Sequence, residues 1–137
     1  MEFSIKSGHP AKARCDCIVV GVFDSRQLSA PAQVLDKAAG GHLAGILRRG
    51  DMEGKSGSTL LAHGTPGIAA ERVLLVGLGK EAEFGEKAYR DALAAAVRAL
   101  KDTGSKNASI TLSELPVARR NAAWRVRQGA LVAHDVL

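Results

Sequence analysis

The stretch at residues 72–80, R-V-L-L-V-G-L-G-K, limits the possible folds more than any other part of the chain. Its centre, residues 73–76, is a continuous apolar run, which is typical of a strand buried on both faces. Gly77 and Gly79 permit a tight turn, and from about Gly85 apolar residues recur every three or four positions, as in an amphipathic helix. Strand, turn and helix form half of a β-α-β unit. The sequence therefore predicts an α/β fold with this strand near the middle of the sheet.

The remaining apolar patterns predict the other strands. They are expected at about residues 2–6, 14–23, 58–63 and 108–112. The connection from 64 to 71 is too short for a crossover helix, so the strands on either side of it should be antiparallel. We expect a mixed, mostly parallel sheet of about five or six strands between helices, in a single domain over residues 1–137.

Helical segments are predicted between these strands. Ser29 is a good N-cap with Pro31 just inside the helix, and Gly40 and Gly41 should divide the following segment into two helices. Gly50 is placed to end the second one. A last helical pattern begins after Pro116 and is still running at residue 137, so we expect the helix to continue beyond this sequence.

Two glycine-rich segments come close to phosphate-binding motifs. Residues 77–82 satisfy G-x-G-x-x-A, a loose form of the dinucleotide fingerprint, but the acidic residue expected about 20 positions later is missing. Residues 50–56 are one residue short of a P-loop and contain two acids, which would repel phosphate. The sequence favours structural turns for both.

Metal-ligating and nucleophilic side chains are present but not grouped. Cys15 and Cys17 lie two apart on a predicted strand, where they should share a face as buried, reduced thiols. The histidines are scattered, C-x-C is not a zinc-ribbon spacing, and no motif activates a serine or cysteine. We expect neither a catalytic nor a metal-binding residue in this chain.

Charge and hydropathy suggest partners only weakly. The net charge is +5, and residues 101–137 carry six basic and three acidic side chains. No run approaches the about 18 apolar residues of a membrane span, and the N-terminus lacks signal-peptide features, so we expect a cytoplasmic protein without membrane contact. Trp124 lies among four arginines that could contact nucleic acid; a solvated helix face is the alternative. These residues are Arg119, Arg120, Arg125 and Arg127.

Three segments, taken in order, carry a family resemblance. They are C-D-C-I-V-V-G-V-F at residues 15–23, L-D-K-A-A-G-G-H-L-A-G-I-L-R-R-G-D-M-E-G-K-S-G at 35–57, and R-V-L-L-V-G-L-G-K at 72–80. They resemble the N-terminal domain of the leucyl aminopeptidases, the cytosol aminopeptidase family of dizinc exopeptidases. The likeness covers essentially the whole chain, and it explains both phosphate-like motifs as structural loops of the family.

The resemblance implies a macro-domain-like fold and an accessory, non-catalytic role. In this family the chemistry belongs to a C-terminal domain, which holds two zinc or manganese ions near an N-T-D-A-E-G-R-L motif and removes N-terminal residues, leucine preferred, from peptides. That motif does not occur here. Residues 117–137 would begin the interdomain helix of a homo-hexamer. Two alternatives stay open, weak DNA binding, as in some bacterial relatives, and a macro-domain-like pocket for an ADP-ribose type ligand near residues 77–80.

Overall fold

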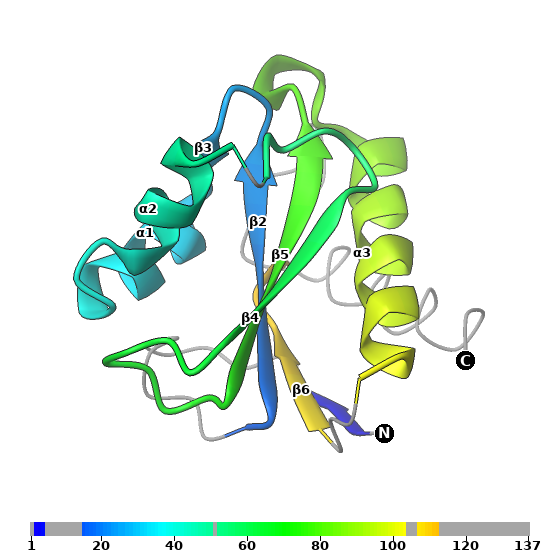
Figure 1. The fold of residues 1–137 in the computed structure, drawn as a ribbon. Coiled ribbons are helices and arrows are strands. Elements are labelled where there is room, and N and C mark those ends of the chain that lie inside the picture. The colour runs from blue at the N-terminus through cyan, green and yellow to red at the C-terminus, as the bar shows by residue number, and fades with distance from the viewer. Residues whose placement is uncertain (1, 5–14, 51, 104–106, 113–137) are drawn as a thin grey trace.

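The computed structural model describes residues 2–4, 15–50, 52–103 and 107–112. It shows one sheet with helices on both faces, α1 and α2 on one side and α3 on the other (Figure 1). The elements in chain order are β1 (Glu2–Ser4), β2 (Cys17–Phe23), β3 (Gln27–Leu28), α1 (Ala30–Ala38), α2 (His42–Arg48), β4 (Thr59–His63), β5 (Arg72–Gly79), the 3-10 helix η2 (Glu81–Glu83), α3 (Glu86–Lys101) and β6 (Asn107–Ile110). The predicted three-layer α/β fold is confirmed.

The six strands form a mixed, mostly parallel sheet. Their order is β1-β6-β2-β5-β4, with the short β3 paired to β2. Neighbours from β1 to β5 are parallel, whereas β4 runs antiparallel to β5 and places Leu60 opposite Leu75. The antiparallel pairing expected from the short connection after β4 is therefore confirmed. It makes β4 the edge strand on the β5 side of the path that the structure describes.

β2 and β5 form the centre of the sheet, as their continuous apolar runs predicted. Every residue of β2 is buried, and β5 is buried from Val73 to Leu78. Because successive side chains point to opposite faces, Leu74 packs toward α3 while Leu75 packs toward α1 and α2. Burial on both faces is what a parallel strand covered by two helical layers requires.

The α3 layer follows directly from the helical periodicity of its sequence. The predicted stripe faces the sheet and is almost fully buried; it consists of Tyr89, Leu93, Ala96, Val97 and Leu100. At its N-terminal end, the rings of Phe23, Phe84 and Tyr89 pack edge to face, with centroid distances of 5.6 and 6.3 Å. These contacts fix the start of α3 against the end of β2.

The α1–α2 layer consists of two short helices joined by glycines. The Ser29 side chain accepts a hydrogen bond from the Ala32 amide at 3.4 Å, which confirms the predicted N-cap. Gly40 and Gly41 both have positive φ, so the chain turns there as predicted. Asp36 on α1 is 8% exposed, and its carboxylate accepts a hydrogen bond from the Leu43 amide at 2.7 Å. A buried side chain thereby caps the second helix from the first.

The two cysteines lie on opposite sides of the sheet, so the prediction that they share a face was wrong. β2 begins at Cys17, and the chain bends at residues 15–16. Since the alternation of faces holds only within a strand, the bend turns the half-buried Cys15 toward the α1–α2 side, while Cys17 packs toward α3. Both thiols are free. Burial, with a smaller contribution from Cys15, raises the pKa of Cys17 to about 12.

Candidate functional site

The carboxyl ends of β2 and β5 meet at one edge of the sheet, where open α/β sheets bind their ligands. Phe23 at the end of β2 lies opposite Gly79 at the end of β5. The chain leaves β2 through a tight turn into β3, and Ser25 and Arg26 in this turn both have positive φ, at 69° and 62°. Consecutive non-glycine residues in this region are uncommon and cost of order 1–3 kcal/mol each. This edge is the strongest candidate for a functional site.

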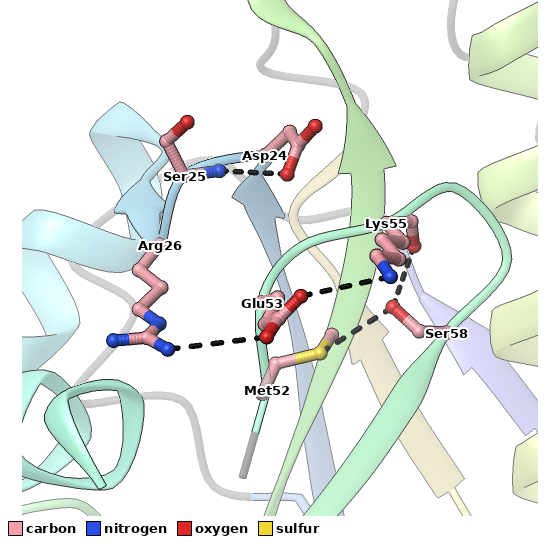
Figure 2. Close-up of polar contacts among 7 residues, drawn as sticks. All are labelled: Asp24, Ser25, Arg26, Met52, Glu53, Lys55 and Ser58. Carbon is pink, nitrogen blue, oxygen red and sulfur yellow. Dashed lines mark hydrogen bonds and ion pairs between the residues drawn. The ribbon is translucent and has the colours of Figure 1, made fainter. Parts of the chain in front are cut away.

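Residues 52–58 run across this edge, beside the turn after β2 (Figure 2). The Gly79 amide donates to the Gly54 carbonyl at 2.9 Å, and the Gly77 amide donates to the Ser58 carbonyl at 2.7 Å. The Arg26 amide donates to the Glu53 carbonyl at 3.1 Å. The loop is therefore tied by its backbone to both central strands.

Glycine is required here because two backbones touch. A side chain at Gly77 would collide with the Lys55 carbonyl oxygen, and one at Gly54 would collide with the Phe23 carbonyl. Gly54 also has a φ of 94°, which side-chain-bearing residues rarely adopt. These glycines therefore permit close packing of the loop onto the strand ends.

The same contacts decide the two phosphate-like motifs, which pack against each other. A phosphate site needs free backbone amides at the glycines, but those of Gly77 and Gly79 already donate to carbonyls of the loop. The interpretation of both segments as structural turns is confirmed. The hypothesis of a ligand pocket near residues 77–80 finds no support in this hydrogen bonding.

The side chains of the loop form a weak charge cluster. Glu53 lies 3.9 Å from the Arg26 guanidinium and 3.7 Å from the Lys55 ammonium, and all three side chains are about half exposed or more. Exposed pairs of this length contribute about 0–1 kcal/mol. The Ser58 hydroxyl, 3.4 Å from the Met52 sulfur, donates to the Lys55 carbonyl. No member is arranged as a nucleophile with an adjacent base, as Figure 2 shows.

Metal-binding side chains do not gather in the part of the chain that the structure describes. No group of three or more His, Cys, Asp and Glu residues there could hold a metal ion. His42 and His63 are exposed on different elements. No helix among the described residues has the length and apolar character needed to cross a bilayer.

Comparison with known proteins decides the family. The model of the cytosol aminopeptidase family, N-terminal domain, matches residues 19–136. The chain belongs to this family. The probable cytosol aminopeptidase of Dechloromonas aromatica is 58% identical over 135 residues, and that of Idiomarina loihiensis is 54% identical over 137 residues. The alignments cover 98% and 100% of this chain but 27% of each relative. The chain thus spans about a quarter of the length of these relatives.

Solved structures show the same fold at low sequence identity. A mutant of tomato leucine aminopeptidase matches with a TM-score of 0.71 and 22% identity, covering 99% of this chain and 27% of that one. The macrodomain of Mycobacterium tuberculosis DarG matches with a TM-score of 0.72 and 9% identity, covering 98% and 91%. The macro-domain-like fold expected from the family resemblance is confirmed.

Two features of this cytosol aminopeptidase domain were missed or lie outside view. The sequence did not predict β3, whose two residues carry no periodic signal, and so it did not predict the strained turn that places Arg26. That turn contains no glycine, the residue that usually marks a positive φ. The four arginines proposed for nucleic acid, and the expected interdomain helix at residues 117–137, lie outside the described residues.

Proposed function

We propose that this chain is the accessory N-terminal domain of a metal-dependent aminopeptidase, and that its own residues perform no catalysis. The observation that carries the proposal is the family match, together with relatives of which the chain spans 27%. In this proposal residues 1–137 form one domain, and the peptidase chemistry lies in the part of the protein beyond it.

The side-chain chemistry of the described residues supports this division. Metal-assisted hydrolysis of a peptide needs clustered carboxylate or histidine ligands around a metal-activated water. The carboxyl edge of the sheet instead holds backbone hydrogen bonds and an exposed charge cluster. We place two zinc or manganese ions, and the preference for N-terminal leucine, in the catalytic domain. A homo-hexamer in the cytoplasm completes the proposal.

Two measurements test the proposal. The 137-residue chain and the same chain joined to its downstream catalytic region are each assayed with leucine amide and analysed for bound metal. We expect metal and hydrolysis with the longer protein only. Stoichiometric zinc or manganese together with activity in the 137-residue chain would overturn the proposal.

Weak nucleic-acid binding is a second candidate, because residues 117–128 contain four arginines and no acid. Such a cluster would neutralise a few phosphates and give salt-sensitive, sequence-independent binding. Repetition on hexamer subunits would raise the avidity. Binding of duplex DNA at low and high salt is compared between the parent and a variant in which all four arginines are glutamine. Binding that survives high salt, or that ignores the substitutions, would contradict this candidate; the residues changed are Arg119, Arg120, Arg125 and Arg127.

A further inference from the structure

A pocket of about 360 Å³ lies beside the strained turn, between β3 and the two helices of the α1–α2 layer. It is separate from the backbone contacts between residues 52–58 and the strand ends. Ligand pockets in proteins begin at about 300 Å³, so this one can hold a small molecule. Its lining comes from four elements, namely Arg26, Leu28, Gln33, Ala44, Leu47 and Arg48.

Two arginines from distant parts of the chain converge on this pocket. Arg26 belongs to the turn after β2, and Arg48 is the last residue of α2. The lining contains two cations and no acidic side chain. Among the described residues, the ion pair given for Arg26 is the one to Glu53 at 3.9 Å, too long for a well-formed charge-assisted hydrogen bond. The pocket therefore presents positive charge that its own lining does not neutralise.

The rest of the lining is apolar or already positioned. Leu47 is 3% exposed, and Leu28 and Ala44 are partly buried, so these side chains form an apolar wall. The Gln33 side-chain amide donates to the Leu28 carbonyl at 3.0 Å, which fixes α1 to β3 and leaves the Gln33 carbonyl oxygen as an acceptor. Cationic and apolar surfaces thus face the same space.

From this arrangement we propose a binding site for a small carboxylate that carries an aliphatic body. The carboxylate pairs with the guanidinium groups of Arg26 and Arg48, because arginine presents paired donors that match a carboxylate. The aliphatic body covers Leu28, Ala44 and Leu47 and removes them from water. A free amino acid and the C-terminus of a short peptide both offer this chemistry. They differ in the ammonium group, which two nearby arginines repel.

The site explains why the protein holds two residues in a costly backbone conformation. Positive φ at Arg26 places its amide against the Glu53 carbonyl and its side chain on the pocket. Strained residues of this kind cluster at ligand clamps, where position matters more than stability. Glu53 then acts as an internal competitor, since its carboxylate occupies the guanidinium that the ligand would use.

The test is a titration of the full 137-residue chain, followed by amide resonances of the pocket. N-acetyl-leucine represents a peptide C-terminus, leucine represents the free amino acid, and N-acetyl-leucinamide lacks the carboxylate. We expect saturable shifts at Ala44, Leu47 and the Gln33 side-chain amide with N-acetyl-leucine, with Kd of about 1 mM. Leucine should bind more weakly, and the amide about tenfold more weakly or not measurably.

Variants identify the groups responsible. Arg26→Gln and Arg48→Gln should each weaken binding about tenfold, since each removes a charge-assisted hydrogen bond. Glu53→Gln should tighten it about twofold to threefold by freeing Arg26. Arg49→Gln is the matched control, because Arg49 is an exposed arginine next to Arg48 that does not line the pocket. It should leave binding unchanged.

Several outcomes would overturn the proposal. These are shifts that do not saturate, equal binding of N-acetyl-leucine and its amide, or equal loss in the Arg49 and Arg48 variants. Inorganic phosphate that binds as tightly as N-acetyl-leucine would show that the apolar wall contributes nothing. If Arg26→Gln disturbs the turn, the Arg48 and Glu53 variants still decide, because both side chains are exposed.

Discussion

The two helical layers that cover the sheet are built differently. On one face, α3 is a single helix of 16 residues whose apolar stripe lies on the strands without interruption. On the other face, α1 and α2 have nine and seven residues and are separated by a glycine turn. Local periodicity is sufficient for the first layer. The second also needs a side-chain contact between its two helices, the one from Asp36 to the Leu43 amide.

This difference concerns how each layer responds to change. A long helix in a continuous core cannot shift to fill a cavity without moving many contacts. Two short helices with a flexible join can adjust more easily. The pocket of the proposed carboxylate site lies in this second layer, where the packing leaves space beside Leu47.

The largest effect is expected from a charge placed under the α1–α2 layer. Leu75 is fully buried on β5 and faces this layer, so Leu75→Asp buries an unpaired carboxylate at a cost of several kcal/mol. We expect no soluble folded protein, as judged by expression and circular dichroism. Leu75→Met is the control and should fold, because it keeps the volume and polarity. A Leu75→Asp variant that melts within a degree or two of the parent would show that this layer does not seal the strand.

Cavities of equal chemistry compare the two layers directly. Leu93 on α3 and Leu43 on α2 are both essentially fully buried, so replacing either with alanine should cost about 2–5 kcal/mol. We expect Leu93→Ala to cost more, because the cost depends on how far the surroundings can collapse. Denaturant unfolding of both variants measures the difference. A larger loss at Leu43 would reverse our comparison.

The contact that joins α1 to α2 should contribute a smaller amount. Asp36→Ala leaves the Leu43 amide without its acceptor and should destabilise the protein by about 1–3 kcal/mol. Asp91→Ala on the exposed surface of α3 is the control and should change stability by about 0.5 kcal/mol or less. Equal effects of the two substitutions in denaturant unfolding would mean that the buried cap is unimportant.

Space in the α1–α2 layer predicts a stabilising substitution. Gly45 lies inside α2, and a side chain there would meet only the end of the Arg48 side chain, at 3.9 Å. Gly45→Ala should therefore stabilise the protein by about 0.5–1 kcal/mol, since alanine restricts the unfolded chain more than glycine does. Thermal unfolding should show a higher Tm. A lower Tm would indicate that the layer is packed as tightly as the α3 side.

The thiols report the two faces without altering stability. Cys15, half-buried toward the α1–α2 layer, should be alkylated in the native protein, whereas Cys17 should react only after unfolding. Its pKa of about 12 keeps Cys17 protonated in the fold while the unfolded thiol ionises near 9.0. The unfolded state is therefore favoured increasingly as the pH rises from about 9 toward 12. Mass spectrometry of the alkylated protein checks the order, and faster labelling of Cys17 would contradict it.

The sequence by itself determined those parts of the protein whose signals are local. The apolar runs of β2 and β5, the stripe of α3, the Ser29 cap and the glycine break between α1 and α2 all lie where predicted. The three family segments also predicted the cytosol aminopeptidase family. Each of these rests on a pattern within a few neighbouring residues, such as a period, a cap or a motif.

Tertiary structure alone decided the features that join distant segments. The side of the sheet that Cys15 faces depends on a bend before β2, and the role of Gly54 and Gly77 depends on two backbones meeting at the strand ends. Likewise Arg26 and Arg48 belong to different elements, and neither carries a local signal for a shared pocket. Convergence in space follows from strand order and helix packing, which a pattern along the chain does not encode.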